Sequence, residues 1–292
     1  MWQQFLINGL IAGSTYGLVA LGFALTYSVS RFFNFAHAAM ITCAAYITLA
    51  LVSGAQLPLG GAIVASITAT AMMGMLTEAA IYRPLRTRQA SSVLLIVASL
   101  GVYVAIQNAI SLLYGDDIQT FFSGQARAGV LIFKARITLA QIVILFTNAA
   151  LYTIVGLFVA RTRTGKAMRA VASAPDLASI VGIDRDRVIL FVFALGSGLG
   201  AVAGILVSFD TDLTPTMGFR VLLMAVVSAI VGGVGSMPGA ILGGLFVGMA
   251  QHIGVWTFPT QWQDAIVFVI LILFLLLRPQ GFLGRPLRST AV

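Results

Sequence analysis

Long apolar stretches alternate with short polar ones along the whole chain. The apolar stretches run approximately over 5–28, 38–54, 61–82, 91–114, 138–160, 188–209, 219–233, 239–255 and 262–278. Several reach the roughly 17–25 residues that a helix needs to cross a bilayer. They lack the strict alternation of a barrel strand, and backbone groups in lipid must be satisfied internally, so we expect α-helices. The pattern predicts an all-α, polytopic integral membrane protein, one domain over 1–292, with about eight to ten transmembrane helices.

The composition supports a membrane protein and excludes a soluble enzyme. Hydrophobic residues make up 59% of the 292 residues and charged residues only 9%, whereas soluble domains carry about 25% charged residues. The net charge is +8, but the basic residues lie in short loops between apolar stretches. We therefore expect the lipid bilayer, and no nucleic acid, as the partner of this positive charge. Cys43 is the only cysteine, so no internal disulfide is possible.

Charge also predicts the topology. Twelve of the 17 basic residues fall in three clusters that should face the cytoplasm: Arg83, Arg86 and Arg88; Arg161, Arg163, Lys166, Arg169, Arg185 and Arg187; and Arg278, Arg285 and Arg288. Most other loops carry acids and should lie outside: Asp116, Asp117, Asp210, Asp212 and Asp264. The side of the amino terminus stays open, because residues 34–37 could form a cytoplasmic loop or a break within the membrane.

Two segments are not simple spans. Residues 115–137 are mixed in polarity and include Val130–Phe133, a candidate short strand in an external excursion. Residues 164–183 have polar residues every three or four positions and apolar ones on another face. This spacing predicts a short amphipathic helix, interrupted at Pro175 and capped by Gly182.

The chain offers little for catalysis. It has one Glu, one Cys and two His, so no cluster with the three or four ligands of a metal site is visible. A serine-protease motif around Ser197 fails at Leu195. A phosphate-binding loop fails because Lys166 is followed by Ala167 and because Ala160 stands where the first glycine is needed. We expect no catalytic residue, metal or cofactor on this chain; if ATP is used, another chain binds it.

Five blocks resemble a known family in sequence and in order. They are NGLIAGSTYGLVALGFALTYSVSRFFNFAHAAM (8–40), YRPLR (82–86), TGKAMRAVASAPDLASIVGIDRDRVI (164–189), GGVGSMPGAILGG (232–244) and RPQGFLGRP (278–286). Together they are similar to LivH-type permeases, the membrane subunits of branched-chain amino acid ABC importers. The blocks span nearly the whole chain, which makes the resemblance specific.

The resemblance implies a multi-pass protein of the bacterial inner membrane with several partners. Such an importer pairs two related permeases with two cytoplasmic ATPases and an external solute-binding protein. Residues 164–183 would be the coupling segment that docks on the ATPase, with the positions Thr164, Gly165, Lys166, Arg169, Ala172, Pro175, Asp176 and Gly182. The alternative is an amphipathic helix that lies on the membrane surface.

Polar residues within apolar stretches are candidates for the solute path. Many family members read Asn-Phe-Ala-His-Gly-Glu where this chain has Asn34, His37, Ala38 and Ala39, so the family's acid is absent. Asn34 and His37 either line the path or bond to nearby backbone and break the helix. Gln107 and Asn108 form a second polar pair, for which bonding between helices is the favoured alternative to lining the path.

Glycines cluster in the last third of the chain. Close helix packing is the simpler interpretation, and hinges or broken helices are the other. The candidate hinge and packing positions are Gly232, Gly233, Gly235, Pro238 and Gly239.

The function that these observations favour is ATP-driven import of a small solute, first of all branched-chain or other apolar amino acids. Urea, short amides and aromatic acids remain alternatives within the same importer class. A secondary transporter or channel that works alone would need buried ionisable groups for ion coupling. The only Glu, Glu78, lies within five residues of Arg83, near the membrane edge, which disfavours that class.

Overall fold

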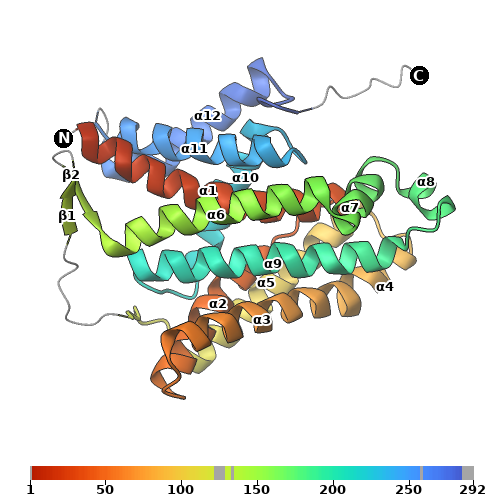
Figure 1. The fold of residues 1–292 in the computed structure, drawn as a ribbon, viewed down its shortest axis with the longest axis horizontal. Coiled ribbons are helices and arrows are strands. Elements are labelled where there is room, and N and C mark those ends of the chain that lie inside the picture. Colours follow the sequence, from red (N-terminus) through yellow and green to blue (C-terminus); the bar gives the residue numbers. More distant parts are fainter. Residues whose placement is uncertain (1, 122–128, 133–134, 257–258, 285–292) are drawn as a thin grey trace.

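The computed structural model describes residues 2–121, 129–132, 135–256 and 259–284. The chain is a bundle of long helices with one small hairpin (Figure 1). The elements are α1 (Trp2–Ser30), α2 (Ala36–Ser53), α3 (Leu59–Thr77), the π-helical turn η1 (Glu78–Tyr82), α4 (Arg83–Thr87), α5 (Ser92–Tyr114), β1 (Gly129–Ile132), β2 (Ala135–Thr138), α6 (Leu139–Arg161), α7 (Arg163–Ser173), α8 (Pro175–Ile180), α9 (Arg185–Asp210), α10 (Met217–Gly232), α11 (Met237–Gly254), the 3₁₀ turn η2 (Thr260–Trp262) and α12 (Gln263–Leu277).

Seven helices in the described ranges are long and apolar enough to cross a membrane, and α10 and α11 would make an eighth span if counted together. Seven or eight spans is at or just below the lower limit of the eight to ten transmembrane helices that the sequence predicts. The apolar stretches at 219–233 and 239–255 form α10 and α11, which are bent by 117° at a short break, as the predicted alternative of a broken helix has it. Gly233 and Gly235 take positive φ there, +112° and +83°, and Pro238 lies in the first turn of α11.

The loops gather at two opposite ends of the bundle (Figure 1). At one end, the α7 end, Arg31 donates a hydrogen bond to the carbonyl of Ala172. At the other, the hairpin end, Trp2 packs on Trp256 with ring centroids 4.0 Å apart. The first two basic clusters lie at the α7 end. The amino terminus lies opposite them, so it is external if these clusters face the cytoplasm.

Two loops predicted to share one side also meet. Residues Gln119 and Leu213 exchange backbone hydrogen bonds of 3.1 and 2.8 Å, which joins the α5–β1 connection to the α9–α10 connection. Strand β1 pairs antiparallel with β2 and confirms most of the short strand predicted at 130–133. Phe133, like Arg127 and Lys134, lies outside the described residues. The described residues of the 115–137 excursion lie at the hairpin end. The external location of the excursion stays a prediction.

Glycines let α1 and α11 cross at backbone contact. A Cβ built on Gly13 would lie 2.9 Å from the carbonyl oxygen of Gly244, closer than real Cβ atoms come. Gly9 meets Gly248 and Met249 in the same way. Spacing of small residues by four brings one face of each helix into this contact. For these glycines close packing is confirmed.

The orientation can be tested with single cysteines in a Cys43→Ser background. We expect Asp117→Cys to react with a membrane-impermeant maleimide in intact cells and Lys166→Cys to react only in inverted vesicles, because basic loops stay in the cytoplasm. Both side chains are exposed, so access to the reagent depends on the side of the membrane. Labelling of Lys166→Cys in intact cells would reverse the orientation.

Candidate functional site

The predicted amphipathic segment forms two short helices, α7 and α8. Thr162 caps α7 by accepting a hydrogen bond of 3.0 Å from the Gly165 amide. Met168 and Val171 are buried beneath α7, as the periodicity predicts, and Ala172 is half-buried. Thr164, Lys166 and Asp176 are exposed. Pro175 begins α8, so the predicted interruption is correct.

The start of α7 is packed tightly on the end of α6. A Cβ on Gly165 would lie 2.6 Å from the Phe158 carbonyl oxygen and from the Val159 Cα. Arg169 is exposed beside Lys166, as predicted, and its guanidinium also donates to the Val159 carbonyl. Cationic side chains commonly satisfy the free carbonyls at a helix end. These contacts attach α7 firmly to a membrane span.

The end of α7 is attached to the connection between α1 and α2. Arg31 donates from Nη2 to the Ala172 carbonyl. Arg31 also has a φ of +61°, a left-handed conformation that is uncommon for a residue other than glycine. The side chain that reaches α7 therefore leaves a strained turn directly after α1.

The turn after α8 contains Gly182, two residues past the last helical residue Ile180, with a φ of +83°. The amides of Gly182 and Ile183 donate to the carbonyls of Ser179 (3.1 Å) and Ala178 (3.0 Å), which closes the helix as predicted. Before this turn α8 exposes three large apolar side chains, Leu177 (64%), Ile180 (79%) and Val181 (73%). No part of the described chain covers them.

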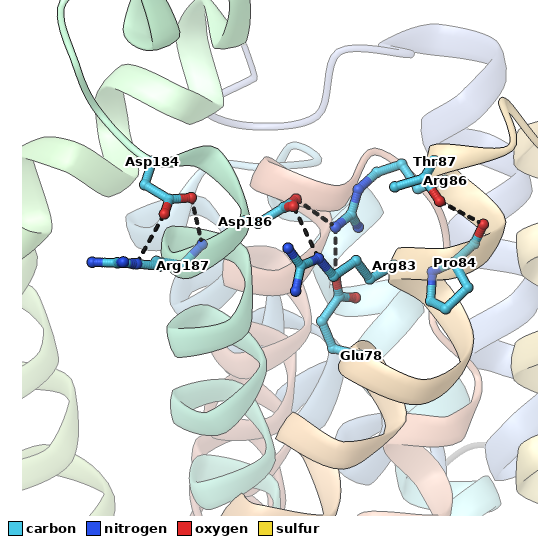
Figure 2. Close-up of polar contacts among 8 residues, drawn as sticks. All are labelled: Glu78, Arg83, Pro84, Arg86, Thr87, Asp184, Asp186 and Arg187. Carbon is cyan, nitrogen blue, oxygen red and sulfur yellow. Dashed lines mark hydrogen bonds and ion pairs between the residues drawn. The ribbon is translucent and has the colours of Figure 1, made fainter.

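The first turn of α9 is tied to η1 and α4 by an ion cluster (Figure 2). Arg86 lies 2.7 Å from the Glu78 carboxylate and 3.2 Å from that of Asp186. Arg83 is 3.0 Å from the other oxygen of Asp186. The charge pattern of the sequence predicts Arg86 and Asp186 in cytoplasmic loops, but it does not predict that residues about a hundred positions apart pair with each other.

Asn34 lies in the break between α1 and α2, and His37 lies in the first turn of α2; both are buried rather than in an exposed loop. The Asn34 Oδ1 accepts hydrogen bonds from the Ala36 amide (3.2 Å) and the Tyr82 hydroxyl (2.9 Å). Asn34 thus bonds to nearby backbone, as one of the two predicted alternatives has it. Ala39, where the family has its acid, is buried in an apolar cluster.

His37 differs from Asn34. Its ring lies beside Gly22 of α1 and Gly200 of α9 and is 1% exposed. Neither ring nitrogen has a hydrogen-bond partner among the described residues. A buried imidazole without a partner is costly, which makes His37 the candidate in this break for contact with a solute or with water.

The polar pair on α5 faces outward. The Asn108 amide donates to the Val104 carbonyl of its own helix (2.7 Å), so a bond from Asn108 to another helix stays a prediction. Its face of α5 carries Val97, Val104 and Leu112, all exposed, and no helix in the described part of the chain covers it. Gln107 is half-buried.

The α10–α11 bend is held by the segment that follows α12. The amides of Phe282 and Leu283 donate to the carbonyls of Val231 (2.8 Å) and Gly232 (2.9 Å). Ser236 caps α11 by accepting from the Gly239 amide (3.2 Å). Two of the sequence blocks, 232–244 and 278–286, thus meet at the bend. The candidate glycines serve both a turn and close packing.

The removal of each polar group in the break should have a different effect. We expect Asn34→Ala to lower the thermal stability of the detergent-solubilised protein, because a buried hydroxyl and a backbone amide lose their acceptor, at about 1–3 kcal/mol per unsatisfied group. We expect His37→Ala to keep the protein level, because no hydrogen bond within the described chain is lost. The same variant should impair uptake, because the imidazole is the candidate contact for the solute. Normal uptake by both variants would remove the pair from the solute path.

These features define a multi-pass membrane protein of the transport-permease class, with a paired-helix projection at one end. The family described as branched-chain amino acid transport system / permease component matches residues 5–275. The chain belongs to this family. It is a multi-pass protein of the inner membrane, and it functions as a permease subunit within a transport system of several components.

Relatives support the family over the full length. The chain is 32% identical over 296 residues to the high-affinity branched-chain amino acid transport system permease protein LivH of Escherichia coli K12, covering 97% of this chain and 96% of that protein. It is 34% identical to the corresponding protein BraD of Pseudomonas aeruginosa, covering 98% and 96%. The fold resembles that of PsaBC from Streptococcus pneumoniae in complex with Fab, with a TM-score of 0.53, 12% identity and coverage of 95% and 92%.

Proposed function

We propose that this chain is a permease subunit of an ATP-driven importer of branched-chain amino acids. The observation that carries the proposal is the full-length similarity to permeases named for this substrate, 32–34% identity over 97–98% of the chain. The residues beside His37 include Gly22, Gly200 and Ile41, which are apolar, as contacts of an apolar amino acid side chain would be.

The assembly that we propose contains a second, related permease, two cytoplasmic ATPase subunits and an external solute-binding protein. The uncovered face of α5 with Asn108 is available for the second permease or for lipid. ATP would bind on the ATPase subunits, since the sequence of this chain lacks a phosphate-binding loop. We propose no metal or cofactor on this chain.

The contact with the ATPase would lie on α7 and α8. Leu177, Ile180 and Val181 form an exposed apolar patch next to the exposed Asp176, and Lys166 is exposed on α7. Apolar anchors with a polar rim are typical of protein interfaces. The segment is attached to α6 through Gly165 and Arg169 and to the α1–α2 connection through Arg31. A push on α8 would therefore be passed into the bundle rather than absorbed by a loose loop.

The proposal is tested by transport in proteoliposomes that contain the complete complex and its binding protein. We expect ATP-dependent accumulation of radiolabelled leucine, isoleucine and valine. An excess of urea, acetamide or phenylalanine, added separately, should leave leucine uptake intact. Accumulation of none of the three amino acids, or strong competition by one of the other solutes, would overturn the substrate assignment. This chain purified alone should hydrolyse no ATP.

A further inference from the structure

The ion cluster of Glu78, Arg83, Arg86 and Asp186 joins η1 and α4 to the start of α9 (Figure 2). These elements lie outside the docking contact proposed on α7 and α8. Arg86 is central in it, because one guanidinium nitrogen reaches both Glu78 and Asp186. Arg83 contacts Asp186 from a more exposed position, with 55% of its side chain accessible against 16% for Arg86. Arg86 is therefore the bridge between η1 and the first turn of α9.

Burial makes this bridge necessary to Glu78. The Glu78 side chain is 1% exposed, and a buried carboxylate is stable only when it is paired. Its second oxygen, Oε2, has no hydrogen-bond partner among the described residues. Arg86 is therefore the main compensation for this charge.

A pocket of about 300 Å³ lies beside the bridge, lined by Glu78, Arg83, Asp184, Asp186, Arg187 and Leu190. Apolar contact between η1 and α9 is present as well, since Tyr82 meets Phe193, two turns beyond Asp186, with ring centroids 5.6 Å apart. At the first turn of α9, the polar connection to η1 runs through Arg86.

The π-helical turn carries a second connection. Tyr82, in the same turn as Glu78, is fully buried and donates to Asn34 in the α1–α2 break. π-Helical turns are rare and occur often at functional sites. This turn is thus linked through Arg86 to the start of α9, three residues after Gly182, and contacts Asn34 in the α1–α2 break directly.

We propose that Arg86 is a positioning residue of the transport cycle, which fixes the exit of the α7–α8 segment to η1 and so passes its movement to the α1–α2 break. The inference rests on the proposed function, because it concerns how ATP-driven movement reaches the solute path. It adds to that function a second route into the bundle, separate from the Arg31 contact.

The test compares transport with ATP hydrolysis in the reconstituted complex. Glu78→Gln/Arg86→Gln removes both buried charges together, so neither is left unpaired and assembly should stay near wild type. We expect the solute transported per ATP hydrolysed to fall about fivefold or more, and Arg86→Lys, which keeps the charge, to recover part of it. The matched control is Arg187→Gln, since the Arg187–Asp184 pair is largely exposed (88% and 51%) and should contribute little.

A covalent bridge tests the mechanical role directly. In a Cys43→Ser, Glu78→Gln background, Arg86→Cys and Asp186→Cys can be joined by a flexible bis-methanethiosulfonate. In the reduced complex, which is not cross-linked, we expect little solute to be transported per ATP hydrolysed (low coupling). Cross-linking should restore this ratio, which a role in folding alone would not produce. Normal coupling of the reduced form, or no recovery in the cross-linked form, would overturn the inference. Failure of the wild-type complex to accumulate any amino acid would instead reject the proposed function.

Discussion

Replacement of Gly182 by valine should reduce ATP-driven uptake in reconstituted vesicles several-fold while the permease still inserts and the binding protein still docks. Gly182 has a φ of +83°, and a β-branched residue in that conformation costs about 1–3 kcal/mol. The strain falls on the turn between α8 and α9, so the segment that would contact the ATPase loses its fixed exit. Uptake and ATP hydrolysis measured on the same vesicles separate uncoupling from loss of protein.

Steric crowding cannot explain such a result, because a Cβ at Gly182 would meet no atom within 4 Å. The matched variant is Gly182→Asn, since asparagine tolerates positive φ, and it should keep most of the uptake. Charge reversal at Asp176 should also uncouple transport by altering the exposed face of α8. Charge reversal at Arg169 should weaken the α6–α7 junction as well. Normal uptake by Gly182→Val and both charge reversals would reject α7–α8 as the ATPase contact.

The second large effect is expected where α1 crosses α11. Gly248→Leu places a side chain against the backbone of Gly13, and two backbones in contact can yield only by separation of the helices. Overpacking of a well-filled interior costs about 1–3 kcal/mol and occasionally more. We expect the yield of monodisperse permease to fall about tenfold or more, measured by size-exclusion chromatography in mild detergent.

Gly156→Leu is the control for this variant. Gly156 lies within α6, and a Cβ there would meet no atom within 4 Å. The same change of residue on an apolar helix should therefore leave the yield unchanged. Equal losses for Gly156→Leu and Gly248→Leu would indicate a general effect of leucine on insertion rather than a contact between α1 and α11.

Features set by local sequence could be predicted. The apolar stretches, the interruption at Pro175 and the turn at Gly182 follow from segment length and backbone restriction. The placement of loops at two ends follows from charge. Each depends on a few neighbouring residues, so the rest of the fold adds little to it.

Features set by distant contacts could not be predicted. The α10–α11 bend has the apolar composition of a pair of straight spans, so the glycines and Pro238 indicated a break only as one of two alternatives. Arg169 is exposed, as predicted, but its hydrogen bond to the Val159 carbonyl depends on how α7 lies against the end of α6. Glu78 and Asp186 share Arg86 across about a hundred residues. The sequence held one sign of this pairing. Basic residues in YRPLR and acidic residues in 184–187 are both predicted at the same face of the membrane.

The clamp on the α10–α11 bend sets an order for biosynthesis. The carbonyls of Val231 and Gly232 receive their hydrogen bonds from Phe282 and Leu283, which are synthesised only after α12. Until then the bend has unsatisfied carbonyls beside flexible glycines, a costly arrangement in an apolar surrounding. The bend can therefore take its final shape only after α12 has entered the membrane, so that the hinge is among the last parts of the permease to mature.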